Sequence, residues 1–363
     1  MTQVFFQTAG GLGLFLLGMI VMTDGLKRLT AKYLHKTLAK FTRSPFSGAL
    51  TGAGTTAILQ SSSATTVATV GFVGAGLLTF PQALGIIFGA NLGTTITGWM
   101  VALLGIKLQL STLLLPLILL GALLHLFGHR RLAATGLAIA GFGLIFVGIS
   151  MLQQGMSGLE GHVSPASFPQ DTFSGRFQLV LLGIAITLIT QSSSAGVATA
   201  LTALHAGTIS FPQAAALVIG MDVGTTVTAA IATLGGSVET RRTGYSHVIY
   251  NLLTAIIALL LLSPFVMAWQ NLLPGGLHNN EIALVAFHSG FNLLGVVLIL
   301  PFAQAFTRLM QYLVPDPEIA ELDRLDKNLL REPAIALTAV STTLQEITLR
   351  LFHYHHSLVA QGK

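Results

Sequence analysis

The stretch TAILQSSSATT, residues 56–66, lies inside 63 consecutive residues (44–106) that contain no Asp, Glu, Lys or Arg. Its centre returns 131 positions later in TLITQSSSAGV, residues 187–197. A run of hydrogen-bonding side chains is costly in so apolar a setting unless each finds a partner. The recurrence of Gln-Ser-Ser-Ser in two such places therefore indicates a shared structural or functional task.

The composition around these segments is that of an integral membrane protein. Of the 363 residues, 52% are hydrophobic and only 9% are charged, against about 25% charged in an ordinary soluble domain. The chain has no cysteine, which excludes disulfides, zinc–thiolate sites and thiol catalysis. We therefore expect an all-α polytopic membrane protein. We attribute the net charge of +5 to basic residues that set the orientation in the membrane, and not to nucleic-acid binding.

About seven apolar runs are long enough for full membrane spans, since about 20 apolar residues cross a hydrocarbon core of about 30 Å. These runs are 4–25, 82–105, 109–128, 132–152, 212–234, 245–270 and 281–306. Two further apolar regions, 47–79 and 177–210, are each interrupted near the middle by QSSS, which leaves two short halves. We interpret both as re-entrant helical hairpins, because broken backbone at membrane depth is tolerated only inside protein or along a wet cavity.

The basic residues support this count. With the N-terminus outside, only Lys107 and Arg176 of the 18 Lys and Arg residues fall outside, as the positive-inside rule expects. The C-terminal tail is then cytoplasmic. Attraction to anionic lipid adds to the same bias.

The similarity between the two QSSS regions extends well beyond them. The matched pairs of segments are 11–25 with 141–155, 56–64 with 187–195, 80–83 with 211–214, and 89–95 with 220–226. Three crossings separate the starts of the two copies, so the copies have opposite orientations. Inverted repeats with broken helices are typical of secondary transporters, whose substrate site lies where the repeats meet.

This pattern predicts a transporter core over residues 1–310 and a cytoplasmic helical tail over 311–363. Within the core we expect repeat 1 at about 4–128, repeat 2 at about 132–270, and an extra span at 281–306. In the tail, Glu332-Pro333 indicates a helix start.

A helix that starts just after Gln60 or Gln191 presents free backbone N–H groups and the positive end of its dipole. The serine hydroxyls add donors there, so two opposed tips could hold an oxyanion without any fixed positive charge. Serine and amide oxygens also accept hydrogen bonds, which favours monohydrogen phosphate modestly over sulfate. The candidate phosphate-binding residues are Gln60, Ser61, Ser62, Ser63, Gln191, Ser192, Ser193 and Ser194. The alternative is that the serines serve only helix packing.

A doubly charged anion in such a site needs mobile cations, because neither hairpin arm beside QSSS offers Lys or Arg. Sodium would bind neutral oxygens and carbonyls freed at the helix breaks. The candidate sodium ligands are Thr56, Asn91, Thr94, Thr95, Thr187, Asp222, Thr225 and Thr226. Asp222 has three readings: a sodium ligand, a protonatable site, or a neutral carboxyl in a helix contact. The pairs His247/Asn251 and His288/Asn292 are expected to form interhelical hydrogen bonds.

The paired T-x-x-x-Q-S-S-S blocks and the segment G-A-N-L-G-T-T resemble the type II sodium/phosphate cotransporter family, bacterial branch, over about residues 1–310. The resemblance implies sodium-driven phosphate symport in a bacterial inner (plasma) membrane, with sodium as the coupling ion and no other cofactor. It departs at Asp222, where the family has Asn. The tail resembles the start of a PhoU-like domain but stops short of one, and a homodimer is left open.

The sequence leaves other transport modes open and argues against two enzymatic activities. The substrate could be another small oxyanion, or the mode could be proton-coupled or export with a phosphate-sensing tail. A serine hydrolase lacks a G-x-S-x-G elbow here, so we expect no enzyme. A P-loop, G-x-x-x-x-G-K-[ST], is also missing, which excludes ATP hydrolysis by this chain.

Overall fold

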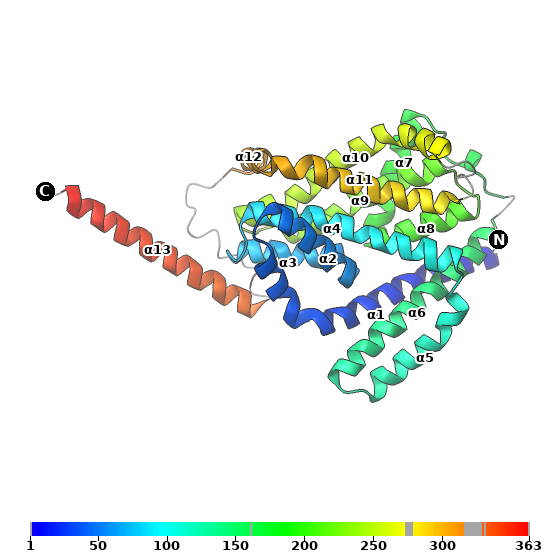
Figure 1. The fold of residues 1–363 in the computed structure, drawn as a ribbon, viewed down its shortest axis with the longest axis horizontal. Helices are drawn as coiled ribbons and strands as arrows, with labels where there is room; N and C mark the ends of the chain where they lie inside the picture. Colours follow the sequence, from blue (N-terminus) through cyan, green and yellow to red (C-terminus); the bar gives the residue numbers. More distant parts are fainter. Residues whose placement is uncertain (1, 160–161, 273–278, 316–328, 330–331, 362–363) are drawn as a thin grey trace.

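The computed structural model describes residues 2–159, 162–272, 279–315, 329 and 332–361, and every element in these ranges is a helix (Figure 1). The α-helices are α1 (Thr2–Phe41), α2 (Pro45–Leu59), α3 (Ser62–Gly74), α4 (Phe80–Met100), α5 (Ser111–Phe127), α6 (Arg130–Ser157), α7 (Phe173–Thr190), α8 (Ser193–His205), α9 (Phe211–Ala232), α10 (Val238–Leu272), α11 (Asn280–Ile299), α12 (Ala303–Leu313) and α13 (Pro333–Gln361). The short elements are η1 (Val101–Lys107), a π-helix that continues α4, and the 3-10 turns η2 (Pro165–Ser167) and η4 (Leu300–Phe302). The expected all-α membrane fold is confirmed.

Seven stretches of the described chain are long and apolar enough to cross a membrane, as expected. They are Thr2–Thr30, Phe80–Lys107, Arg130–Ser157, Phe173–Thr190, Phe211–Ala232, Val238–Asn271 and Asn280–Leu313. One member differs from the expected set. Helix α7 reaches 18 residues because it begins at Phe173, and α5, at 17 residues, is slightly too short to be included. The re-entrant path of the hairpins and the sides on which the termini lie remain predictions.

Helices α1 and α6 form the most extensive helix pair of the fold, and they run antiparallel. Gly18 of α1 and Gly141 of α6 lie directly against the backbone of the other helix, so a Cβ atom on either would overlap backbone atoms. Such small-residue contacts are how membrane helices approach closely. Helix α5 packs on α6 at the edge of the molecule (Figure 1), and its leucines face outward as lipid-facing residues do.

Two further helix pairs repeat the same contact at positions 131 residues apart. Gly89 of α4 lies against the carbonyl of Ala49 in α2, and Gly220 of α9 lies against the carbonyl of Val180 in α7. In both pairs a Cβ atom would collide with that carbonyl. The arm before each QSSS segment is therefore fixed to the helix that follows the hairpin in the same way.

Helices α4 and α9 form the centre of the bundle. The apolar 18-residue segment of α4 with η1 is 67% buried, and that of α9 is 72% buried, whereas that of α10 is only 22% buried. Because these two helices carry the segments around Asn91 and Asp222, the polar groups predicted to be functional lie in the best-shielded part of the protein.

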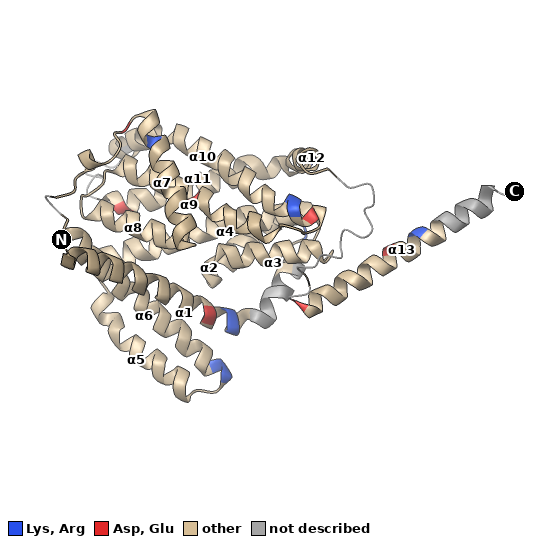
Figure 2. Cartoon of the chain, turned by 180° about the vertical axis from the view of Figure 1, so that it is seen from behind, with Lys and Arg blue, Asp and Glu red and all other residues tan. Residues whose placement is uncertain are grey.

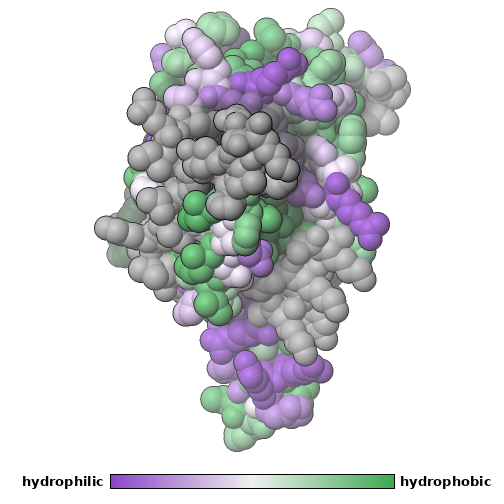
Figure 3. All heavy atoms as spheres, turned by 90° about the vertical axis from the view of Figure 1, so that its left-hand side faces the viewer, coloured by the Kyte–Doolittle hydropathy of each residue, from purple (hydrophilic) through white to green (hydrophobic). Residues whose placement is uncertain are grey.

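Apart from Asp222, the charged residues of the described membrane-spanning stretches lie near the ends of those stretches. Figure 2 shows the basic positions of α1, the α5–α6 turn, α10 and α13 on the side of the bundle away from the N-terminus, and that of α7 nearer the N-terminus. Viewed from the side of α12 and α13, the lower end of the molecule carries hydrophilic side chains next to hydrophobic ones (Figure 3). This distribution agrees with the topology expected from the sequence, although the orientation itself stays a prediction.

The C-terminal helix α13 begins at Pro333, which confirms the helix start expected at Glu332-Pro333. Ile335 packs against the hydrophobic cluster that includes Phe72 of α3, and Ala339 packs with Ala75. The C-terminal part of α13 extends away from the bundle (Figure 1). The tail therefore contacts the arm that begins with the first serine triplet. Residues 316–328 lie outside the described residues.

Candidate functional site

Both QSSS segments interrupt a helix with the same backbone geometry. Gln60 adopts the left-handed conformation at φ 54° and ψ 32°, and Gln191 adopts it at φ 53° and ψ 25°. Gln109 is the only other non-glycine residue with a positive φ among the described residues. A left-handed residue ends a helix and reverses the chain. The structure therefore breaks both helices where the sequence predicted.

The first serine of each triplet starts the following helix. The hydroxyl of Ser61 accepts a hydrogen bond from the backbone N–H of Ala64 at 3.2 Å, and that of Ser192 accepts from Ala195 at 3.2 Å. These are N-cap bonds, which commonly stabilise a protein by about 1 kcal/mol. Ser61 and Ser192 thus have a structural task in addition to any contact with a ligand.

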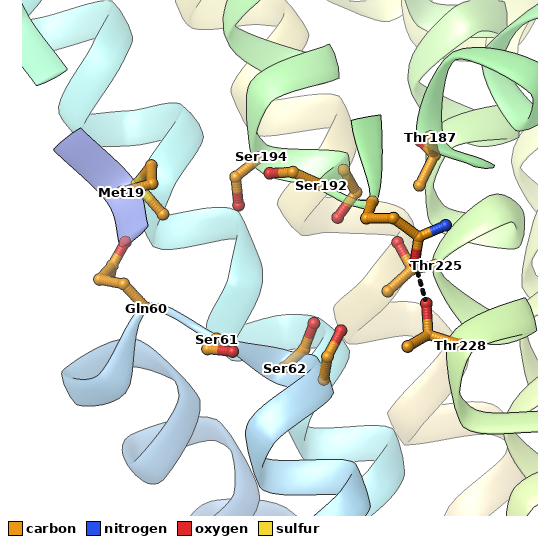
Figure 4. Close-up of a pocket in the computed structure, with 12 residues that line it drawn as sticks. Met19, Gln60, Ser61, Ser62, Thr187, Ser192, Ser194, Thr225 and Thr228 are labelled. Carbon is orange, nitrogen blue, oxygen red and sulfur yellow. Dashed lines mark hydrogen bonds between the residues drawn. The ribbon is translucent and has the colours of Figure 1, made fainter. Parts of the chain in front are cut away.

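The two QSSS segments line one pocket, to which each contributes all four of its residues. Met19, Thr187, Thr225 and Thr228 complete the lining. The cavity volume is about 70 Å³, several times the ~10–15 Å³ needed for one water molecule. In Figure 4 the start of α3, with Ser61 and Ser62, and the start of α8, with Ser192 and Ser194, face each other across this space.

The electrostatics of the pocket come from neutral groups. No lining residue is charged, and two helix N-termini meet there, each with free N–H groups and the positive end of a helix dipole. The hydroxyls of Ser62 and Ser193 make no intramolecular hydrogen bond within the described part of the chain, although both residues are largely buried. Like the hydroxyls of Ser63 and Thr187, they are side-chain donors that are free to serve a ligand.

Two residues of the site escaped the sequence reasoning. Thr97 donates to Oε1 of Gln60 at 2.7 Å, and Thr228 donates to Oε1 of Gln191 at 3.2 Å. The amide nitrogens of Gln60 and Gln191 donate to the carbonyls of Ala57 and Leu188. Each glutamine side chain is thus fixed by two hydrogen bonds to residues of the same repeat. The 131-residue offset, extended two residues past 95 and 226, would have found this threonine pair.

Of the eight predicted sodium ligands, only Thr187 and Thr225 line the pocket. The hydroxyls of four threonines (Thr94, Thr95, Thr225 and Thr226) donate to carbonyls of their own helices, which leaves oxygen lone pairs free. Thr56 donates instead to Thr65, at 3.0 Å. The hydroxyl of Thr187 is buried without a partner, so the second repeat has an unused donor and acceptor at the pocket.

The remaining two predicted ligands, Asn91 and Asp222, lie in buried hydrogen-bonded clusters. His247 donates from Nε2 to Oδ1 of Asn91 at 3.0 Å. His288 donates from Nε2 to Asp222 at 3.1 Å. Asn251 and Asn292 bind the same two residues at 2.9 and 2.8 Å. The interhelical hydrogen bonds expected for the two His/Asn pairs are therefore confirmed. One pair joins α10 to α4, and the other joins α11 to α9.

The sequence profile of the Na+/Pi-cotransporter family matches residues 14–154 and 166–299. The uncharacterized protein YqeW of Bacillus subtilis (strain 168) is 30% identical over 305 residues, which cover 83% of this chain and 95% of YqeW. No solved structure matches the chain.

A second group of relatives carries a functional name. The putative inorganic phosphate export proteins YjbB of Salmonella typhimurium (strain LT2) and Escherichia coli (strain K12) are each 28% identical over 330 residues, which cover 88% of this chain. The match takes in 58% of the YjbB length. The family match covers most of the chain and both QSSS regions, so this multi-pass membrane protein belongs to the Na+/Pi-cotransporter family, a family of transporters and not of enzymes.

Proposed function

We propose that this protein is a secondary transporter that couples sodium to the movement of inorganic phosphate, with phosphate held between the two QSSS tips. The observation that carries the proposal is the single pocket lined by all four residues of both segments. The family match and the names of the YjbB relatives support phosphate as the substrate.

Phosphate fits the donor and acceptor pattern of the pocket. Its ionised oxygens would accept hydrogen bonds from Ser62, Ser193 and the N–H groups at the starts of α3 and α8. Its remaining O–H would donate to a serine oxygen, a partner that sulfate cannot use. This difference in hydrogen bonding is the physical basis for a modest preference for phosphate over sulfate.

Sodium is the proposed source of the missing positive charge. The pocket lining carries no cationic side chain, and a dianion in a weakly solvated site needs a counter-charge. Sodium ions bound at threonine oxygens and at Asp222 would supply it, so that anion and cation affinities rise together. Because each ion then raises the affinity for the other, sodium and phosphate bind together and are transported together.

The direction of transport has a second candidate. The relatives named YjbB are called putative export proteins, which favours net phosphate efflux over uptake for that group. A cotransporter is reversible, and its direction follows the sum of the gradients. Export through the same pocket would therefore require a different driving ion or a different gradient, not a different binding site.

The remaining assignments complete the proposal. Residues 1–310 form the transport core as two inverted repeats in a bacterial plasma membrane. Residues 311–363 form a cytoplasmic regulatory tail. Sodium is the only ion or small molecule required besides phosphate, and the protein acts alone or as a homodimer.

The test is flux by the purified protein in proteoliposomes. An inward sodium gradient should drive accumulation of labelled phosphate, and reversal of the gradient should drive its release. Replacement of sodium by choline should abolish both, whereas a pH gradient should have little effect. Equal flux in choline would overturn the sodium coupling, and flux driven only by a pH gradient would establish the proton-coupled alternative. Competition by unlabelled sulfate, with none by phosphate, would overturn the choice of substrate.

A further inference from the structure

The two His/Asn clusters differ in one chemical group, and that difference changes their hydrogen bonding. In the first cluster Asn91 both accepts and donates. Its Oδ1 accepts from His247, and its Nδ2 donates to Oδ1 of Asn251 at 2.9 Å. Asn251 in turn donates to the carbonyl of His247 at 2.9 Å. The oxygen and the nitrogen of both side-chain amides, Asn91 and Asn251, therefore each have a hydrogen-bond partner.

In the second cluster Asp222 replaces Asn91 and has no N–H to give. Asn292 therefore donates from Nδ2 to both available acceptors, Asp222 at 2.8 Å and the carbonyl of His288 at 3.1 Å. Because both partners are acceptors, the orientation of this amide is fixed. Its oxygen, Oδ1, is left without a hydrogen-bond partner, in a side chain with 0% exposure. An unpaired buried acceptor of this kind is rare and costly.

We propose that a sodium ion binds between the carboxylate of Asp222 and Oδ1 of Asn292. This inference rests on the proposed function and deepens it: it names Asn292 as a sodium ligand and restricts this site to the second repeat. One amide spans about 2.2 Å from N to O, so Oδ1 lies within about 5 Å of the carboxylate. Hard cations hold oxygen ligands at about 2.3–2.6 Å, and one ion can therefore reach both.

The charge of Asp222 requires a cation at this place. Its ion-pair partner within the described residues is His288, whose Nδ1 is buried without a partner. Nδ1 of His288 faces no acceptor among the described residues, so an N–H at that atom would be buried without a hydrogen bond. Neither α9 nor α11 contains Lys or Arg. A buried carboxylate without a compensating charge is strongly unfavourable, and a bound sodium ion removes that cost.

The position of the site connects it to the pocket. Asp222 precedes the pocket residue Thr225 by three residues on α9, which is about 4.5 Å along the helix axis. An ion there lies close enough to stabilise an anion at the tips of α3 and α8. Binding at this site would therefore raise phosphate affinity, and its loss would lower the sodium dependence of transport and leave the pocket itself intact.

The experiment measures sodium binding directly, on the full chain in detergent and without phosphate. Thermal stability is recorded against sodium concentration, with choline chloride at equal ionic strength. Bound ions that prefer the native state raise the melting temperature. We expect sodium to stabilise the wild type. Asp222→Asn should reduce this stabilisation by the contribution of one ion, because its amide can satisfy Asn292 as Asn91 satisfies Asn251. Asn292→Val should reduce it as well.

The matched control is the reciprocal change in the first cluster. Asn91→Asp should orphan Oδ1 of Asn251 and create a second sodium response, and the double exchange of Asn91→Asp with Asp222→Asn should restore a single one. In flux assays the Hill coefficient for sodium should fall by about one in Asp222→Asn. Retention of the full sodium stabilisation in Asp222→Asn would overturn the site. So would a wild type whose stability responds to pH and not to sodium, which would assign a proton to Asp222.

The failure of this inference can be told apart from that of the proposed function. If sodium-driven phosphate flux is unchanged in both Asp222→Asn and Asn292→Val, the proposed transport function stands and the proposed sodium site is wrong. If sodium binding depends on Asp222 but the protein transports no phosphate, the sodium site stands and the proposed transport function is wrong.

Discussion

The unit formed by α2, α3 and α4 and the unit formed by α7, α8 and α9 share a scaffold but differ in their polar chemistry. Both have a left-handed Gln, a capping Ser and a glycine pressed against the partner carbonyl. The second unit has Gly196, His205 and Asp222 where the first has Thr65, Gly74 and Asn91. Backbone geometry is thus duplicated, and the ionisable groups are concentrated in the second unit.

The largest expected effect comes from breaking the shared scaffold. Gly89→Val and Gly220→Val each place a side chain where a Cβ atom alone overlaps the carbonyl of Ala49 or Val180. Overpacking against rigid backbone should cost more than ~3 kcal/mol, so both variants should give little folded protein. Yield and elution of the detergent-solubilised protein on size exclusion measure this. A well-folded Gly220→Val beside a misfolded Gly89→Val would show that the two contacts are not equivalent.

The next effect concerns the ligand side of both units. Ser62→Ala and Ser193→Ala each remove a hydroxyl that the protein does not use internally. A hydrogen bond to a charged group contributes about 1.5–3 kcal/mol, so each change should weaken phosphate binding about ten- to hundredfold. Both should leave the melting temperature unchanged.

The matched control for these variants is Ser61→Ala, which removes an N-cap bond and should lower the melting temperature. The phosphate concentration at half-maximal flux and thermal melts separate the two outcomes. If Ser62→Ala shows the wild-type dependence of flux on phosphate concentration, Ser62 serves helix packing and does not bind phosphate.

A smaller effect should follow from releasing the glutamines. Thr97→Val and Thr228→Val remove the donor to Oε1 of Gln60 and of Gln191. A neutral hydrogen bond contributes about 0.5–1.5 kcal/mol. The Thr97 bond is shorter and more buried, and Ser194 of the other unit also reaches Thr97, at 3.4 Å. We therefore expect Thr97→Val to reduce flux more than Thr228→Val, and the opposite order would place the tighter contact in the second unit.

The smallest effect concerns the ion pair at the end of α8. His205 lies 2.6 Å from Glu281 of α11, and this hydrogen bond raises the pKa of His205 above its usual value of 6.5. The corresponding residue of the first unit is Gly74, which cannot ionise. A raised pKa means that the pair stabilises the fold fully below about pH 6.5 and that this contribution disappears as pH rises through the raised value.

The imidazole is 41% exposed, so the pair should contribute at most about 1 kcal/mol, or about 1–3 °C in melting temperature. Thermal melts of the wild type between about pH 5.5 and pH 8.5 should show this loss, and His205→Ala should remove it. Equal pH slopes in the two proteins would show that the pair does not contribute.

Much of this arrangement could be predicted from the sequence because it depends on local chemistry. The breaks at Gln60 and Gln191, the helix start at Pro333 and the interhelical role of His247 and His288 all follow from short-range patterns. The length of α7 did not, because its start in the loop after α6 has no strong apolar boundary. Thr97 and Thr228 were missed because one threonine on a helix does not reveal which tip it faces.

The partners of Asn91 and Asp222 needed the three-dimensional structure. His247 and His288 lie 156 and 66 residues away from them in the chain, and no local pattern fixes such pairings. The sequence indicated a departure at Asp222, but the orphaned oxygen of Asn292 appears only once the amide has been placed between two acceptors.

The most direct test of the account is phosphate binding to the purified protein by isothermal titration calorimetry, in sodium and in choline. The pocket between the tips requires that wild-type protein bind phosphate in sodium and lose most of that affinity in choline. A Ser62→Ala/Ser193→Ala double variant should bind poorly in both salts. Equal phosphate affinity for the wild type and the double variant, in either salt, would contradict the claim that the two serine tips hold the anion.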